Sequence, residues 1–176
     1  MSKAHQKPWA EPDMVFIALF FLLVFAARPT TALGAGGVGL ANQFLAPQNA
    51  ARAVLGMAPL AWDERVARYA AWYANQRRRD CALKHSNGPY GENIFWGSGD
   101  GWTPGQAVAA WLSERKWYLH AGNRCISGQE CGHYTQIVWS RSRRVGCAKV
   151  TCSGGGGDFM TCNYDPPGNY IGEKPY

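Results

Sequence analysis

The chain lacks several motifs that would assign it to a familiar class of enzyme. It has no Gly-x-Ser-x-Gly, and its glycine-rich run 153–158 lacks the Gly-Lys-Ser/Thr ending of a phosphate loop. These absences argue against a serine hydrolase built on a nucleophile elbow and against a P-loop nucleotide enzyme. No two cysteines have the spacing Cys-x-x-Cys, and there is no Asn-x-Ser/Thr sequon. We therefore expect neither a zinc–thiolate cluster nor an N-linked glycan.

An apolar run long enough to span a membrane is also missing, since a spanning helix needs about 20 such residues. The uncharged apolar stretch near the start covers only residues 14–27, and Lys3 and Lys7 precede it. This pattern predicts a signal peptide over residues 1–32, cut after Ala32, with Thr30 and Ala32 as the small residues of the cleavage site. An uncleaved membrane anchor is the alternative. Residues 33–41 then form a flexible lead-in to a domain that covers residues 42–176.

Acidic residues are few, with 12 Asp and Glu against 18 Lys and Arg, which gives a formal charge of +6. The basic residues are scattered, and no segment resembles a nucleic-acid-binding module. Such a surface favours anionic partners, for example microbial envelopes or acidic wall polymers, although most of these charges are simply solvated.

Cysteine, in contrast, is abundant for the length of the chain. All six cysteines follow the predicted signal peptide, which predicts three disulfides in an oxidising compartment. Spacing alone leaves all 15 connectivities open. A thiol nucleophile is not expected, because every cysteine is assigned to a bridge.

The pattern of residues predicts helices first and strands later, which is typical of an α+β domain. Pro47 can open a short helix that runs to about Leu55, and Asp63 is placed to cap a second helix that reaches Arg77. Thr103 to Gln106 forms a capping box with proline at the first helical position of a third helix. Three β-prone runs follow, at residues 133–139, 144–151 and 159–164.

Three stretches carry a family resemblance: Gly132 to Trp139 (GHYTQIVW) directly behind Cys131, His85 to Asn93, and Cys162 to Tyr170 (CNYDPPGNY). The chain resembles the cysteine-rich secretory, antigen 5 and pathogenesis-related (CAP) superfamily, and in particular its plant pathogenesis-related class 1 proteins. The resemblance implies a three-layer α-β-α sandwich over residues 42–176. It also implies the disulfides Cys81–Cys152, Cys125–Cys131 and Cys147–Cys162.

The resemblance also groups four side chains from distant parts of the chain, His85, Glu92, Glu114 and His133, around one cleft. Two imidazoles and two carboxylates can bind a divalent cation, and nitrogen ligands favour zinc. The same four residues could instead form a hydrogen-bonded polar cluster with a structural role. No residue is assigned a catalytic role, and no cofactor is required.

Two further regions gain an expected function from the resemblance. The segment from Arg124 to Tyr134 lies where the family has its sterol-binding loop, so Arg124, Ile126 and Tyr134 are candidate lipid-binding residues. An ordinary disulfide-closed surface loop is the alternative. At the C-terminus, plant relatives release an eleven-residue signalling peptide, which corresponds here to residues 166–176 after cleavage between Asp165 and Pro166.

The sequence thus predicts a secreted plant defence protein of the extracellular space, the apoplast. We expect it to be antifungal, monomeric and non-enzymatic, to bind sterols or other lipids of pathogen membranes, and not to insert stably in a membrane once the signal is cut. The alternatives are a precursor of the C-terminal peptide and a metal-dependent hydrolase.

Overall fold

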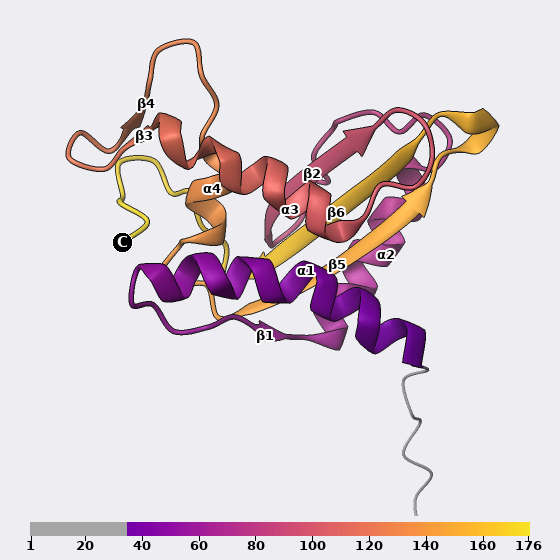
Figure 1. Ribbon diagram of the computed structural model, residues 1–176, viewed down its shortest axis with the longest axis horizontal. Helices are drawn as coiled ribbons and strands as arrows, with labels where there is room; N and C mark the ends of the chain where they lie inside the picture. Colours follow the sequence, from indigo (N-terminus) through magenta and orange to yellow (C-terminus); the bar gives the residue numbers. More distant parts are fainter. Residues whose placement is uncertain (1–34) are drawn as a thin grey trace, which may run out of the picture. The chain divides into compact units, whose positions relative to one another are not determined.

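A four-stranded sheet forms the centre of the domain in the computed structural model, which describes residues 35–176 (Figure 1). The strands are β1 (Ala61–Trp62), β2 (Gly91–Gly97), β5 (Arg144–Thr151) and β6 (Asp158–Asp165), in the order β1-β5-β6-β2. β1 runs parallel to β5, and the other two pairs are antiparallel. The predicted signal peptide, residues 1–32, lies outside the described residues.

Helices cover both faces of this sheet. α2 (Glu64–Arg77) packs on β5 and β6, while α1 (Ala35–Val54), α3 (Pro104–Ser113) and α4 (Gly132–Ile137) cover the opposite face (Figure 1). Side chains of β6 alternate between the two cores: Phe159 lies with the α2 side, and Met160, Cys162 and Tyr164 lie with the other. The three-layer α-β-α sandwich is therefore confirmed.

The predicted starts of two helices are confirmed because they depend on local hydrogen bonds. Asp63 Oδ1 accepts from the amides of Arg65 at 2.8 Å and Val66 at 3.1 Å, which caps α2. Thr103 and Gln106 form the capping box of α3. A 3₁₀ turn, η1 (Glu114–Trp117), continues α3 toward the small sheet of β3 (Tyr118–Leu119) and β4 (Arg124–Cys125).

All three expected disulfides are present: Cys81–Cys152, Cys125–Cys131 and Cys147–Cys162. The last pair is directly opposite in the β5–β6 ladder. The glycine-rich run 153–158 connects these two strands, and it contains the short turn η2 (Ser153–Gly155). In the described part of the chain, no helix combines the length and the apolar character that crossing a membrane requires.

The first helix begins earlier than expected, so the predicted flexible lead-in is wrong for most of its length. α1 starts at Ala35 and continues through Pro47, which leaves Pro47 inside the helix instead of at its start. Proline removes one backbone hydrogen bond there. The helix continues because Phe44, Gln48 and Arg52, spaced four residues apart, are all fully buried on one face.

The strand predicted for residues 133–139 is also wrong, because this segment forms α4. Its aromatic and β-branched residues Tyr134, Thr135 and Ile137 are buried, as is Gln136 between them. β-propensity reflects burial as much as backbone preference, so tertiary contacts decided the conformation. β2, in turn, covers Gly91–Gly97, a segment that was not among the predicted strands.

Candidate functional site

The first candidate site pair joins His85, in the loop after α2, to Glu92 on β2. His85 Nδ1 donates to Glu92 Oε1 at 2.8 Å, and the amide of Ser86 donates to the same oxygen at 2.9 Å. Asn163 Nδ2 on β6 donates to Glu92 Oε2 at 3.1 Å. The Glu92 side chain is nearly buried, whereas the imidazole is 55% exposed. This carboxylate therefore has enough donors to remain ionised inside the protein.

The charges in this pair shift both pKa values. The hydrogen bond to Glu92 raises the pKa of His85 above its usual value, and this outweighs the effect of partial burial. Burial would raise the pKa of Glu92, but the hydrogen bonds from His85, Ser86 and Asn163 lower it further than burial raises it. An imidazolium–carboxylate pair is thus favoured at mildly acidic pH.

The second pair joins His133, at the start of α4, to Glu114, the first residue of η1. His133 Nδ1 donates to Glu114 Oε1 at 2.6 Å. Glu114 Oε2 accepts from the amides of His133 at 3.0 Å and Tyr134 at 3.2 Å. Glu114 therefore satisfies two of the amides that the first turn of α4 leaves free. The Trp111 ring stacks on the imidazole with centroids 6.2 Å apart.

The structure thus arranges the predicted tetrad as two His–Glu pairs. Asn93, next to Glu92 on β2, donates to the carbonyl of His133 at 3.0 Å and so links the strand of one pair to the helix of the other. Within residues 35–176, no group of three or more His, Cys, Asp or Glu side chains is arranged to hold a metal ion. The four residues consequently do not form one cluster of four direct ligands.

The chemistry of each pair nevertheless suits a metal-binding histidine. A carboxylate on one ring nitrogen fixes the tautomer and leaves the other nitrogen with its lone pair free, which is how many zinc-bound histidines are oriented. His85 and His133 are the residues that would hold a divalent cation, and Glu92 and Glu114 would orient them. A bound zinc ion would supply Lewis acidity at this site.

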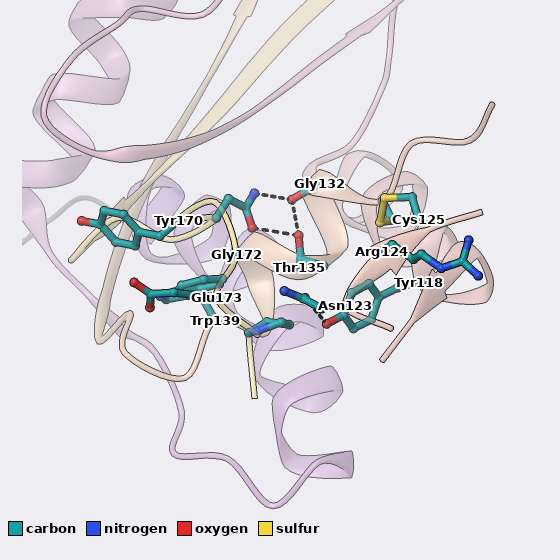
Figure 2. A pocket seen from close by; sticks show the side chains of 13 residues that line it. Tyr118, Asn123, Arg124, Cys125, Gly132, Thr135, Trp139, Tyr170, Gly172 and Glu173 are labelled. Atoms are coloured by element: carbon teal, nitrogen blue, oxygen red, sulfur yellow. Dashed lines mark hydrogen bonds between the residues drawn. A yellow bond between two sulfur atoms is a disulfide. The ribbon is translucent and has the colours of Figure 1, made fainter. Parts of the chain in front are cut away.

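The candidate lipid-binding residues do not share one pocket. Arg124 lines a hollow of about 290 Å³ between β3–β4, α4 and the C-terminal residues, but its guanidinium points away from Trp139 and Tyr170 (Figure 2). Ile126 is 40% exposed and does not line this hollow. Tyr134 is buried, and its hydroxyl lies 3.3 Å from that of Tyr176.

Tyr134 instead lines a second hollow of about 200 Å³ between α1, α3 and α4. The other lining residues are mainly aliphatic, with one cation at the edge: Ala51, Val54, Leu55, Leu112 and Arg115. The resemblance predicted Tyr134 as a lipid-binding residue of the loop 124–134, whereas in the structure it lines an apolar hollow without Arg124 or Ile126.

Comparison with known proteins decides the family. The model of the cysteine-rich secretory protein family (CAP) matches residues 45–164. The chain belongs to this family. It is 65% identical over 135 residues to pathogenesis-related protein PR-1 of Medicago truncatula, which covers 77% of this chain and 78% of the relative. It is 48% identical over 163 residues to pathogenesis-related protein 1 of Arabidopsis thaliana, covering 93% and 94%.

Solved structures of other proteins agree with this fold. The crystal structure of NaASP2 with Zn²⁺ superposes with a TM-score of 0.63 at 29% identity, covering 77% of this chain and 83% of that one. BmVAL-1 superposes with a TM-score of 0.66 at 23% identity, covering 78% and 81%.

The predicted cleavage point lies where β6 ends. Asp165 is the last residue of β6, and its carboxylate pairs with Arg144 at 2.7 Å and Arg65 at 3.4 Å. Its carbonyl accepts from the amide of Arg143 at 3.0 Å. Pro166 is exposed. The bond between them thus joins a paired strand residue to the exposed start of the C-terminal segment.

Sequence reasoning missed the residues that hold the two pairs in place. Asn163 and Asn93 are fully buried and bind the Glu92 carboxylate and the His133 carbonyl. Both lie within motifs that carried the resemblance, Cys162–Tyr170 and His85–Asn93. For Asn163 the available signal is an amide between Cys162 and Tyr164 in a β-prone run, since buried amides require partners. Asn93, between Glu92 and Ile94, carries no such signal.

Proposed function

We propose that this chain is a secreted plant defence protein that acts without catalysis, as a monomer in the apoplast, by binding lipid from pathogen membranes. Relatives at 65% and 48% identity are named pathogenesis-related proteins. Three disulfides suit an oxidising extracellular compartment. Antifungal action would follow from removal or disturbance of membrane lipid.

The observation that carries lipid binding is the apolar hollow between α1, α3 and α4. Aliphatic side chains from α1 and α3 line it, and Arg115 and Tyr134 supply a cation and a ring at its edge. Such a combination suits an amphipathic molecule with an apolar body and a polar end. A volume of about 200 Å³ is below the roughly 300 Å³ typical of small-molecule sites. It therefore favours a single acyl chain, and a sterol would require α1 to move away from α3.

Filling this hollow tests the proposal directly. Mature protein, residues 33–176, is titrated with a fluorescent fatty acid and with a fluorescent sterol. Ala51→Phe places a ring in the hollow and should weaken binding about tenfold or more, because the ligand would have to displace it. Ala53→Phe is the matched control, since Ala53 is an exposed residue of the same helix and lines no part of the hollow. Equal binding by both variants would contradict the site, and no saturable binding by the parent protein would contradict lipid binding altogether.

The second candidate function is a precursor of the peptide 166–176. The observation that favours it is that Pro166 begins a segment outside the sheet, while Asp165 still belongs to the β5–β6 ladder. Mass spectrometry of extracellular fluid from infected tissue should then detect a fragment that begins at Pro166. Its absence while the intact chain accumulates would count against this function.

A further inference from the structure

Residues 166–176, the C-terminal segment, lie against α4 and the loop that follows it. The hydroxyl of Ser142 donates to the carbonyl of Pro166 at 2.8 Å, and the amide of Gly168 donates to Gln136 Oε1 at 3.0 Å. The backbone approaches so closely that a Cβ at Gly168 would lie 2.6 Å from Trp139 Cγ. The start of the segment is therefore fitted to this surface.

Asn169 provides the next contact, through both ends of its amide. Its Nδ2 donates to the carbonyl of Gly132 at 2.8 Å, and its Oδ1 accepts from the hydroxyl of Thr135 at 2.8 Å. Figure 2 draws these bonds at Gly132 and Thr135. A side-chain amide that pairs two groups on the first turn of α4 recognises that turn in the way a bound peptide would.

Arg141 holds the middle of the segment. Its guanidinium lies over the rings of Trp139 and Tyr170, at 5.7 Å and 5.4 Å from their centroids, and it pairs with the carboxylate of Glu173. The Trp139 and Tyr170 rings are themselves 6.1 Å apart. One cation thus joins an aromatic and an acidic side chain of the segment to the loop after α4.

The C-terminal end of the segment also contacts the domain. The amide of Ser140 donates to the carbonyl of Pro175 at 2.7 Å, and Pro175 is buried. The ring of Tyr176 stacks on His120 with centroids 4.6 Å apart. Between these points Ile171 is fully exposed. The segment is therefore anchored at several separate places and free between them.

We propose that the surface formed by Gly132, Thr135, Gln136, Trp139, Ser140 and Arg141, the α4 groove, is a peptide-binding site whose ligand is the C-terminal segment. The segment stays bound without a covalent link after Asp165–Pro166 is cut, and its release is a separate, slower step. This inference rests on the second candidate function, the peptide precursor.

Hydrolysis by an external protease adds one water across the Asp165–Pro166 bond and leaves a carboxylate on Asp165 and a secondary amine on Pro166. None of the contacts described for residues 168–176 uses that bond.

A controlled cut tests the proposal in the whole protein. A recognition sequence for a site-specific protease is inserted between Asp165 and Pro166, and the folded mature chain is cut completely. Gel filtration and a fluorophore attached near Ile171 then report how much of the segment stays with the domain and how fast it leaves. Circular dichroism before the cut confirms that each variant is folded.

We expect the segment to co-elute with the domain after the cut. Asn169→Ala and Arg141→Ala should each speed its dissociation by about five- to tenfold, because each removes two contacts between the segment and the α4 groove. Ile171→Ala is the matched control within the segment and should change the rate by less than about twofold.

Immediate loss of the segment from the cut parent protein would overturn the proposal, as would equal dissociation rates for Asn169→Ala, Arg141→Ala and Ile171→Ala. The test does not depend on natural processing. If the groove retains the segment but no fragment beginning at Pro166 occurs in extracellular fluid, the precursor function is contradicted. The assignment of the α4 groove as a peptide-binding site then still holds.

Discussion

Asp158 shows how a single buried charge connects separate parts of the domain. Its carboxylate pairs with Lys149 Nζ at 2.9 Å and accepts from the hydroxyl of Thr151 at 2.9 Å and the amide of Trp102 at 3.0 Å. Burial would raise the pKa of Asp158, but the hydrogen bonds from Lys149 and Thr151 lower it below its usual value. The folded protein therefore binds the proton at this site less readily than the unfolded chain does.

The stability contributed by Asp158 should depend on pH in a defined direction. It is fully present above the unfolded pKa of about 3.8 and is lost as pH falls through the lower folded pKa. Asp158→Asn should cost about 1.5–3 kcal/mol of unfolding free energy at pH 7, measured by denaturant titration. The difference from the parent protein should shrink as pH falls below 3.8. Asp100→Asn, at an exposed position in the loop between β2 and α3, is the control, and an equal loss in both variants would contradict the assignment.

Arg52 is a second residue whose role only the structure reveals. It is fully buried, and its guanidinium donates to the carbonyls of Ala58 at 2.9 Å, Ile137 at 2.9 Å, Trp139 at 2.9 Å and Ser142 at 3.2 Å. Burial lowers the pKa of Arg52, but these four carbonyls stabilise the charged form.

Removal of this side chain should destabilise the domain strongly. Arg52→Ala removes the guanidinium donor from four carbonyls and leaves a cavity at the end of α4, so we expect a loss of about 3 kcal/mol or more. Thermal unfolding of the mature chain measures this loss, with Arg68→Ala, at an exposed position of α2, as the control. A loss below about 1 kcal/mol would mean that water replaces the guanidinium.

At the scale of elements, the sequence correctly predicted the helix starts that depend on neighbouring residues. It missed helices whose conformation depends on residues far away in the chain. The start of α2 needs only Asp63 and the two amides that it caps. The start of α4 needs Glu114, which lies about 20 residues earlier in the chain and accepts from its first amides. No window of neighbouring residues contains that cap, so the β-prone composition of this segment was misleading.

The packing of α2 on β5 depends on one glycine. A Cβ at Gly146 would lie 2.1 Å from the amide nitrogen of Ala67 and 2.5 Å from the carbonyl carbon of Val66. Both are backbone atoms of α2, so a side chain here forces the helix away from the sheet.

Gly146→Ala should therefore destabilise the protein by about 1–3 kcal/mol, the range typical of an overpacked core. Gly105→Ala, in α3, is the matched control, because a Cβ there meets only Thr103 Oγ1 at 4.0 Å. That variant should stabilise the domain by about 0.4–1 kcal/mol, since alanine restricts the unfolded chain. Equal denaturant midpoints for the two variants would refute the close approach of α2.

At the scale of the whole molecule, resemblance supplied what local reasoning could not. The six cysteines allowed 15 pairings, and only the family motifs selected the three that the structure contains. The grouping of His85, Glu92, Glu114 and His133 also came from the resemblance, but their arrangement as two pairs did not. That arrangement depends on Asn93 and Asn163, whose roles appear only when β2 and β6 are side by side.

The two His–Glu pairs allow a test that distinguishes a metal-binding role of these residues from a purely structural one. His85 and His133 each have one ring nitrogen engaged by a carboxylate, whereas His120 Nε2 lies 2.7 Å from the main-chain oxygen of Tyr176. If zinc binds through the first two, the double variant His85→Ala/His133→Ala should lose at least about tenfold in zinc affinity by calorimetry. The disulfide-linked fold should persist in circular dichroism. His120→Ala should leave zinc affinity unchanged. Zinc binding that survives the double variant would place the metal elsewhere, and unfolding of that variant would assign the pairs an architectural role.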